Sequence, residues 1–80
     1  MKTRKLKAIT VQFRCDRRQK VITRPGKKPE TFIFEKGTQF TGIPTVRPVK
    51  WKGIYREAFD LLLNDDRLVL SIWYEAVKIL

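Results

Sequence analysis

The spacing of apolar residues changes along the chain, and this change constrains the fold more than any other feature. From Ile9 to Arg14, apolar and polar residues alternate, which predicts a β-strand with one buried face. After Gly53 the apolar residues recur at helical spacing, so residues 53–63 are predicted to form an amphipathic helix that ends at Asn64-Asp65-Asp66. The sequence therefore predicts a fold of the α+β class.

Two hairpins of a small antiparallel sheet are expected between residues 8 and 42. The first would join the strand of residues 8–14 to the short β-branched run Val21-Ile22-Thr23. The second would join residues 31–35 to residues 38–41 through a tight turn at Lys36-Gly37, where glycine can adopt a positive φ.

Prolines mark the expected connections. Residues 24–30 should form a loop, because Pro25 and Pro29 cannot donate to a ladder. Pro44 and Pro48 should hold residues 42–49 in an extended connection that crosses to the helix. Residues 67–80 fit either a final strand beginning at Arg67 or a second helix.

The segment Phe32-Ile33-Phe34-Glu35-Lys36-Gly37-Thr38-Gln39-Phe40 places an apolar strand before Lys-Gly and a further strand after it. This segment resembles the diverging turn of Src-homology-type small β-barrels. The resemblance covers about nine residues and implies a five-stranded barrel as the alternative fold, with no implication for function.

A chain of 80 residues supports one small core, since domains of this size bury only about 60 to 65% of their unfolded surface. We expect residues 1–7, which carry four basic side chains, to form a flexible basic arm, and residues 8–80 to form a single domain. The only cysteine, Cys15, excludes an internal disulfide and favours a reducing compartment, the cytoplasm. No apolar run is long enough to span a membrane as a helix.

Charge is segregated along the chain. Residues 1–52 hold 15 Lys/Arg and 3 Asp/Glu, whereas residues 53–80 hold 3 and 5. A surface this basic attracts polyanions, so we expect a negatively charged partner. The predicted helix has an acidic polar face that anionic lipid would repel, so a membrane partner is not expected.

Catalysis, metal binding and cofactor binding are not indicated. The chain has no histidine, the side chain most often used for proton transfer near neutral pH, and we expect the protein not to be an enzyme. Cys15 lies near arginines that would favour its thiolate, but a lone cysteine is more often a packed residue. Asp65 and Asp66 are ordinary turn formers, so no metal site is expected.

Basic residues and one tryptophan are the candidate binding residues. Basic side chains around the first hairpin and the following loop suit phosphates at several points, and Trp51 between two lysines could stack on an unpaired base or anchor the helix. The candidates are Arg14, Arg17, Arg18, Lys20, Arg24, Lys27, Lys28, Lys50, Trp51 and Lys52.

These residues predict a protein that binds RNA or DNA phosphates through a basic hairpin surface. The alternative is an adaptor or inhibitor that docks on an acidic protein surface, and a merely solubilising role for the charge also remains open. Exposure of Trp51, Tyr55 and Tyr74 beside the basic face would favour nucleic acid, whereas an apolar patch away from that face would favour a protein partner.

Overall fold

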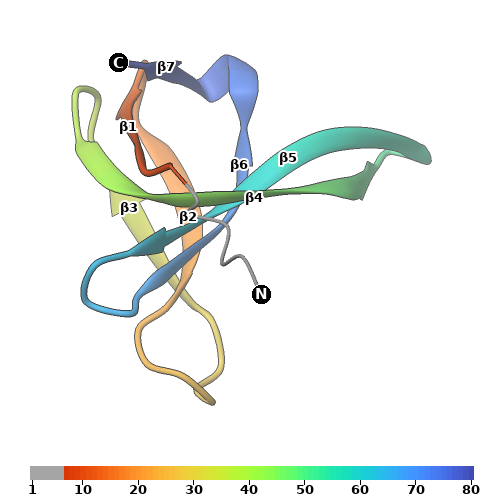
Figure 1. The fold of residues 1–80 in the computed structure, drawn as a ribbon. Coiled ribbons are helices and arrows are strands. Elements are labelled where there is room, and N and C mark those ends of the chain that lie inside the picture. Colours follow the sequence, from red (N-terminus) through yellow and green to blue (C-terminus); the bar gives the residue numbers. More distant parts are fainter. Residues whose placement is uncertain (1–6) are drawn as a thin grey trace, which may run out of the picture.

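Seven strands form a single antiparallel sheet that curls into an open half-barrel (Figure 1). The computed structural model describes residues 7–80, and the predicted basic arm therefore lies almost entirely outside the described residues. The elements are β1 Ile9–Phe13, β2 Arg17–Ile22, β3 Glu30–Phe34, β4 Gln39–Trp51, β5 Ile54–Leu63, β6 Leu68–Trp73, the 3₁₀ turn η1 Tyr74–Ala76 and β7 Val77–Ile79. The strand order is β3-β2-β6-β5-β4-β1-β7.

The predicted helix over residues 53–63 is wrong, and with it the α+β class. This segment is strand β5, which pairs with β4 along its whole length. Phe59, Leu61 and Leu63 alternate into the core. Ile54, Ala58 and Leu62 occupy alternate positions on the other face, so that apolar residues on both faces imitate a helical period.

Neither predicted hairpin forms. β1 pairs with β4 and β7, and β2 pairs with β3 and β6, so β1 and β2 are not neighbours. The turn before β4 does exist, with Gly37 at φ 90°. The strands on either side of it do not pair with each other, because β3 pairs with β2 and the start of β4 pairs with β1. The hairpins that form are β2–β3, across the predicted proline loop, the long β4–β5 ribbon, and β5–β6.

The predicted crossing connection at residues 42–49 is part of the continuous strand β4. β1 pairs only with the first residues of β4, up to Gly42, so beyond that point one edge of β4 has no neighbour in the described sheet. Pro44 and Pro48 are four residues apart, so their nitrogens face the same side of the strand. A residue without an N–H is tolerated at such a free edge.

Of the two alternatives for residues 67–80, the strand is observed: β6 begins one residue after Arg67 and is followed by η1 and β7. The five-stranded barrel implied by the resemblance of residues 32–40 is not observed, because the seven strands leave β3 and β7 as the two edges of an open sheet. Within residues 7–80, the structure contains no helix with the length and apolarity needed to cross a membrane.

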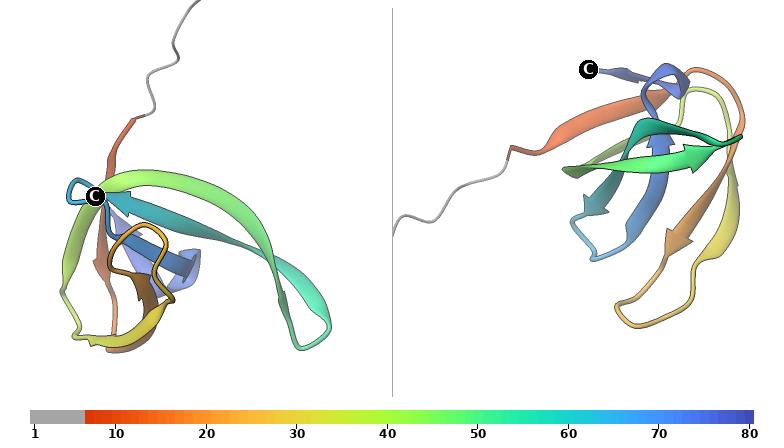
Figure 2. Two further views of the ribbon diagram at one scale, coloured as in Figure 1. Left: turned by 90° about the horizontal axis from the view of Figure 1, so that it is seen from below. Right: turned by 90° about the vertical axis from the view of Figure 1, so that its right-hand side faces the viewer.

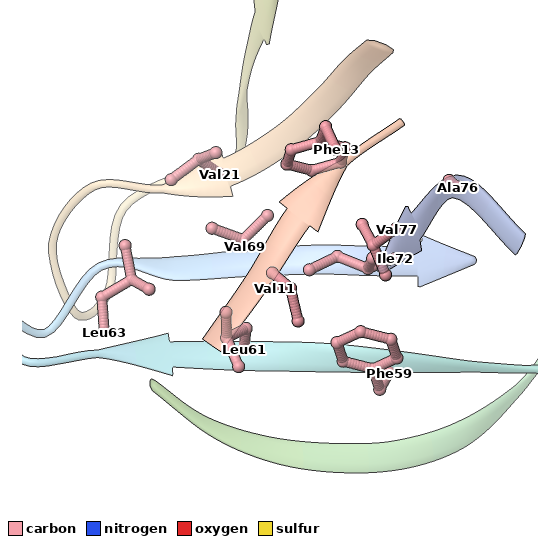
Figure 3. Close-up of a cluster of buried hydrophobic side chains, with 10 residues drawn as sticks. All are labelled: Val11, Phe13, Val21, Phe59, Leu61, Leu63, Val69, Ile72, Ala76 and Val77. Atoms are coloured by element: carbon pink, nitrogen blue, oxygen red, sulfur yellow. The ribbon is translucent and has the colours of Figure 1, made fainter. Parts of the chain in front are cut away.

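The core lies inside the curve of the sheet (Figure 3). Its largest fully buried side chains are Phe13, Phe59, Leu61 and Ile72. Strand alternation places the neighbours of these residues on the opposite face, which is where the candidate site is found.

Candidate functional site

A groove of about 600 Å³ lies beside β6, mostly on the face of the sheet opposite the core. β6 forms its floor, β2 one wall and the β4–β5 ribbon the other, because β6 stands between β2 and β5 in the sheet. We call it the basic groove, and its lining residues are Arg17, Arg18, Gln19, Lys20, Arg47, Val49, Trp51, Leu70, Ser71 and Trp73.

The ribbon gives the outer face its concave shape. β4 and β5 continue well beyond the residues that pair with β1, and Figure 2 shows the ribbon curving away from the rest of the sheet. On β4, Arg47, Val49 and Trp51 occupy alternate positions, so all three side chains face the groove.

A β-bulge bends the floor of the groove. Between the pairs Phe59↔Ile72 and Leu61↔Val69, β6 has one residue more than β5, and Ser71 adopts a positive φ of 53°. Bulges of this kind increase local twist and redirect side chains. Here the bulge lets Ile72 return to the core while Trp73 faces outward.

The carboxylate of Asp60 holds this bulge in place. It accepts a hydrogen bond from the Ser71 backbone N–H at 2.9 Å, and its two oxygens share the single Nε–H of Arg47, whose nitrogen lies 3.0 and 2.9 Å from them. Arg47 Nη2 also donates to Ser71 Oγ at 2.6 Å. The Asp60 side chain is 14% exposed, so this network ties β4, β5 and β6 together at the base of the groove.

Replacing Asp60 by asparagine is expected to lower the free energy of unfolding by about 1–2 kcal/mol, because it removes a charge-assisted pair and leaves Arg47 facing an amide donor. Urea denaturation measures the loss. Asp65→Asn is the matched control, since Asp65 pairs with Arg67 at the surface and should cost less than about 0.5 kcal/mol. Equal losses in the two variants would show that the Asp60 network does not brace the groove.

Two tryptophans line the groove: Trp51 lies on the wall formed by the β4–β5 ribbon, and Trp73 lies on the floor. The rings of Trp51 and Trp73 meet edge to face, with centroids 6.2 Å apart. The guanidinium of Arg56 lies 4.7 Å from the Trp73 ring centroid and donates a hydrogen bond to Glu75. This hydrogen bond lowers the pKa of the Glu75 carboxyl, so Arg56 remains paired with a carboxylate while it covers Trp73.

Three basic residues of β2 line the opposite side of the groove, namely Arg17, Arg18 and Lys20. Arg18 and Lys20 share the outer face of the strand, whereas Arg17 alternates with Arg18. In the described part of the chain, ion pairs within 4.0 Å join only Arg47, Arg56 and Arg67 to carboxylates. Within residues 7–80, the three cations of β2 therefore have no carboxylate within 4.0 Å. Arg47, at the base of the groove, is paired with Asp60.

The structure brings together only four of the ten predicted binding residues, Arg17, Arg18, Lys20 and Trp51. Arg14 lies at the end of β1, where its Nε donates to the Val77 carbonyl at 3.1 Å. It lines a separate hollow of about 540 Å³ with Lys36 and Lys78.

The remaining predicted residues lie at the ends of hairpins. Arg24, Lys27 and Lys28 belong to the loop at the end of the β2–β3 hairpin, and all three are exposed. Lys50 and Lys52 are exposed near the tip of the ribbon, where Lys52 Nζ lies 5.8 Å from the Trp51 ring centroid and Lys50 Nζ lies 6.0 Å from that of Tyr55.

Sequence reasoning missed Arg47, Arg56 and Trp73 as site residues. It placed Arg47 in a connection and Arg56 on a helix. Because residues 67–80 fitted either a strand or a helix, the face on which Trp73 lies was not predicted. The run Val69-Leu70-Ser71 gave no signal of a bulge. Within residues 7–80, no three His, Cys, Asp or Glu side chains gather closely enough to hold a metal ion.

Comparisons with protein-family models, with curated proteins and with solved structures found no match.

Proposed function

We propose that the protein is a non-enzymatic nucleic-acid-binding protein that holds phosphates with the basic groove. One observation carries the proposal: Arg17, Arg18 and Lys20, which have no ion pair in the described structure, line the same groove as the half-exposed Trp51. Unpaired cations beside an accessible aromatic ring match the two surfaces that nucleic acid offers, its phosphates and its bases.

Net charge supports the same partner. The chain carries a formal charge of +10, which repels itself within the fold and attracts polyanions. Each phosphate neutralised by a lysine or arginine releases condensed counterions, so affinity rises without sequence preference and falls steeply with salt. We propose the cytoplasm as the compartment, because Cys15 has no cysteine partner within the chain.

Changing Arg17, Arg18 and Lys20 together to glutamine is expected to weaken oligonucleotide binding by about ten- to a hundredfold at moderate salt, since each contact contributes on the order of 0.5–1 kcal/mol. The dependence of log affinity on log salt should become shallower by about 2 for a single strand. Fluorescence anisotropy at several salt concentrations measures both quantities, and thermal unfolding should be almost unchanged.

A second triple variant provides the matched control. Arg24, Lys27 and Lys28 changed to glutamine removes the same charge from a loop outside the groove. It should weaken binding by less than about threefold, because only long-range attraction is lost. If both triple variants lose affinity equally, net charge rather than the groove explains binding, and the groove is not the site.

Docking on an acidic protein is the second candidate. Ile54 and Tyr55 at the ribbon tip are 67% and 69% exposed, and Tyr55 lies near Lys50 rather than in the groove. Apolar side chains flanked by lysines suit an interface with an acidic rim. Failure of the unmodified protein to bind any nucleic acid at about 0.1 M salt would favour this candidate.

A further inference from the structure

We propose that the basic groove selects single-stranded nucleic acid by stacking one unpaired base on Trp51. This inference rests on the proposed function and adds the class of strand that the groove takes. It follows from three features of the groove: the position of its cations, the exposed surface of Trp51 and the small number of polar groups left to read base edges.

Charge and apolar surface lie on opposite walls of the groove. The three free cations are on β2, whereas Val49 and Trp51 are on the ribbon, and Leu70 and Trp73 lie on the floor between them. A single strand presents phosphates on one side and bases on the other, and both can contact such a groove at once. In a duplex the bases are stacked inside, so their faces cannot reach Trp51.

Trp51 is the ring with free surface. It is 51% exposed, although it touches Trp73 edge to face and the exposed Lys52 places its Nζ 5.8 Å from the ring centroid. Trp73 is less accessible, because Arg56 covers its ring and is itself held by Glu75. Stacking on an aromatic ring uses the face of a base, which every base has. Trp51 is therefore the platform, and Trp73 and Arg56 support it.

The groove offers few groups for reading base edges. Gln19 carries its only side-chain amide among the described lining residues, and Gln19 Nε2 already donates to the Leu70 carbonyl at 2.8 Å. Ser71 Oγ is already engaged by Arg47. Base-edge recognition depends on amide, guanidinium or carboxylate groups in matched geometry. The unpaired guanidinium groups of this groove, those of Arg17 and Arg18, are the groups assigned to phosphates, so binding should tolerate different sequences.

A competing arrangement would insert the β4–β5 ribbon into the major groove of a duplex, which admits a two-stranded ribbon. The ribbon tip argues against it, because Trp51, Ile54 and Tyr55 are exposed there and such apolar side chains do not read base edges. The volume of about 600 Å³ also falls in the range of about 300–1,000 Å³ typical of sites for small ligands, which suits a short stretch of one strand.

Three probes of about twelve nucleotides test the inference: an oligothymidylate, an abasic strand with the same phosphates, and a duplex. Fluorescence anisotropy at about 0.1 M salt measures each affinity. The unmodified protein should bind the oligothymidylate about 5- to 150-fold more tightly than the abasic strand, the range for one stacked base. It should also prefer the oligothymidylate to the duplex.

Two variants at position 51 separate stacking from folding. Trp51→Leu should remove the preference for the oligothymidylate over the abasic strand while leaving abasic binding unchanged, and Trp51→Phe should retain much of the preference. Thermal unfolding confirms that both variants fold, as expected for a half-exposed residue. An unchanged preference in Trp51→Leu, or duplex binding as tight as single-strand binding, would overturn the inference.

The outcomes distinguish this inference from the proposed function. If all three probes bind equally and lose affinity in the Arg17, Arg18 and Lys20 variant, phosphate binding stands and base stacking is wrong. If none of the probes binds, the proposed function itself is wrong, and single-strand selection is wrong with it.

Discussion

Replacing Leu61 by alanine is expected to lower the free energy of unfolding by about 2–5 kcal/mol, the cost of truncating a buried leucine. Leu61 is fully buried (0% exposed) in the core cluster on β5. A domain of this size has a total stability on the order of 4–12 kcal/mol, so a large part of it would be lost. The melting temperature should fall by about 8 °C or more, as measured by circular dichroism.

The adjacent residue is the control that makes this result informative. Leu62 is 43% exposed on the other face of β5, and Leu62→Ala should cost about 1 kcal/mol or less. An amphipathic helix over residues 53–63 would place both leucines on its buried face and make their losses similar. Similar losses would therefore contradict the strand, and a large difference would support it.

Replacing Gly42 by alanine is expected to cost about 3 kcal/mol, which is at the upper end for overpacking. Gly42 is buried where β4 leaves β1 and continues along β5. A Cβ at this position would lie 2.8 Å from the carbonyl carbon of Leu62 and closer still to its oxygen. Both are backbone atoms of the adjacent strand, so β4 and β5 would have to separate.

Gly26 provides the matched control for this substitution. A Cβ at position 26 would meet no atom within 4 Å, but its φ of 82° is in the left-handed region. Gly26→Ala should therefore cost only the conformational strain of about 1–2 kcal/mol. Urea denaturation compares the two variants, and a Gly42→Ala protein as stable as Gly26→Ala would show that β4 can move away without a significant cost.

Local sequence patterns predicted the elements that have one buried face or strong turn chemistry. The strand at Ile9–Phe13 alternates in burial as expected, and the prolines of residues 24–30 lie in the loop between β2 and the start of β3. Gly37 adopts the positive φ that its turn requires. In each case the signal comes from neighbouring residues, so no information about distant strands was needed.

Three of the ten residues that line the groove followed from charge alone. Arg17, Arg18 and Lys20 were identified because basic residues gather in that part of the chain. Their position beside Trp51 was not predictable, because it depends on pairing between β2 and β6 and on the curve of the ribbon. Asp60 and Arg47 were missed for the same reason, since their network joins three strands that are distant in sequence.

Composition and local alternation were sufficient to predict the basic first half, one small core and the strand at Ile9–Phe13. Tertiary structure decided the state of β5 and the pairing of the strands. β5 carries apolar residues on both faces, so its sequence pattern resembles that of an amphipathic helix. The segment is a strand because its backbone hydrogen bonds are made with β4 and β6. Strand pairing is non-local, and no periodicity within one segment specifies which distant segment will lie beside it.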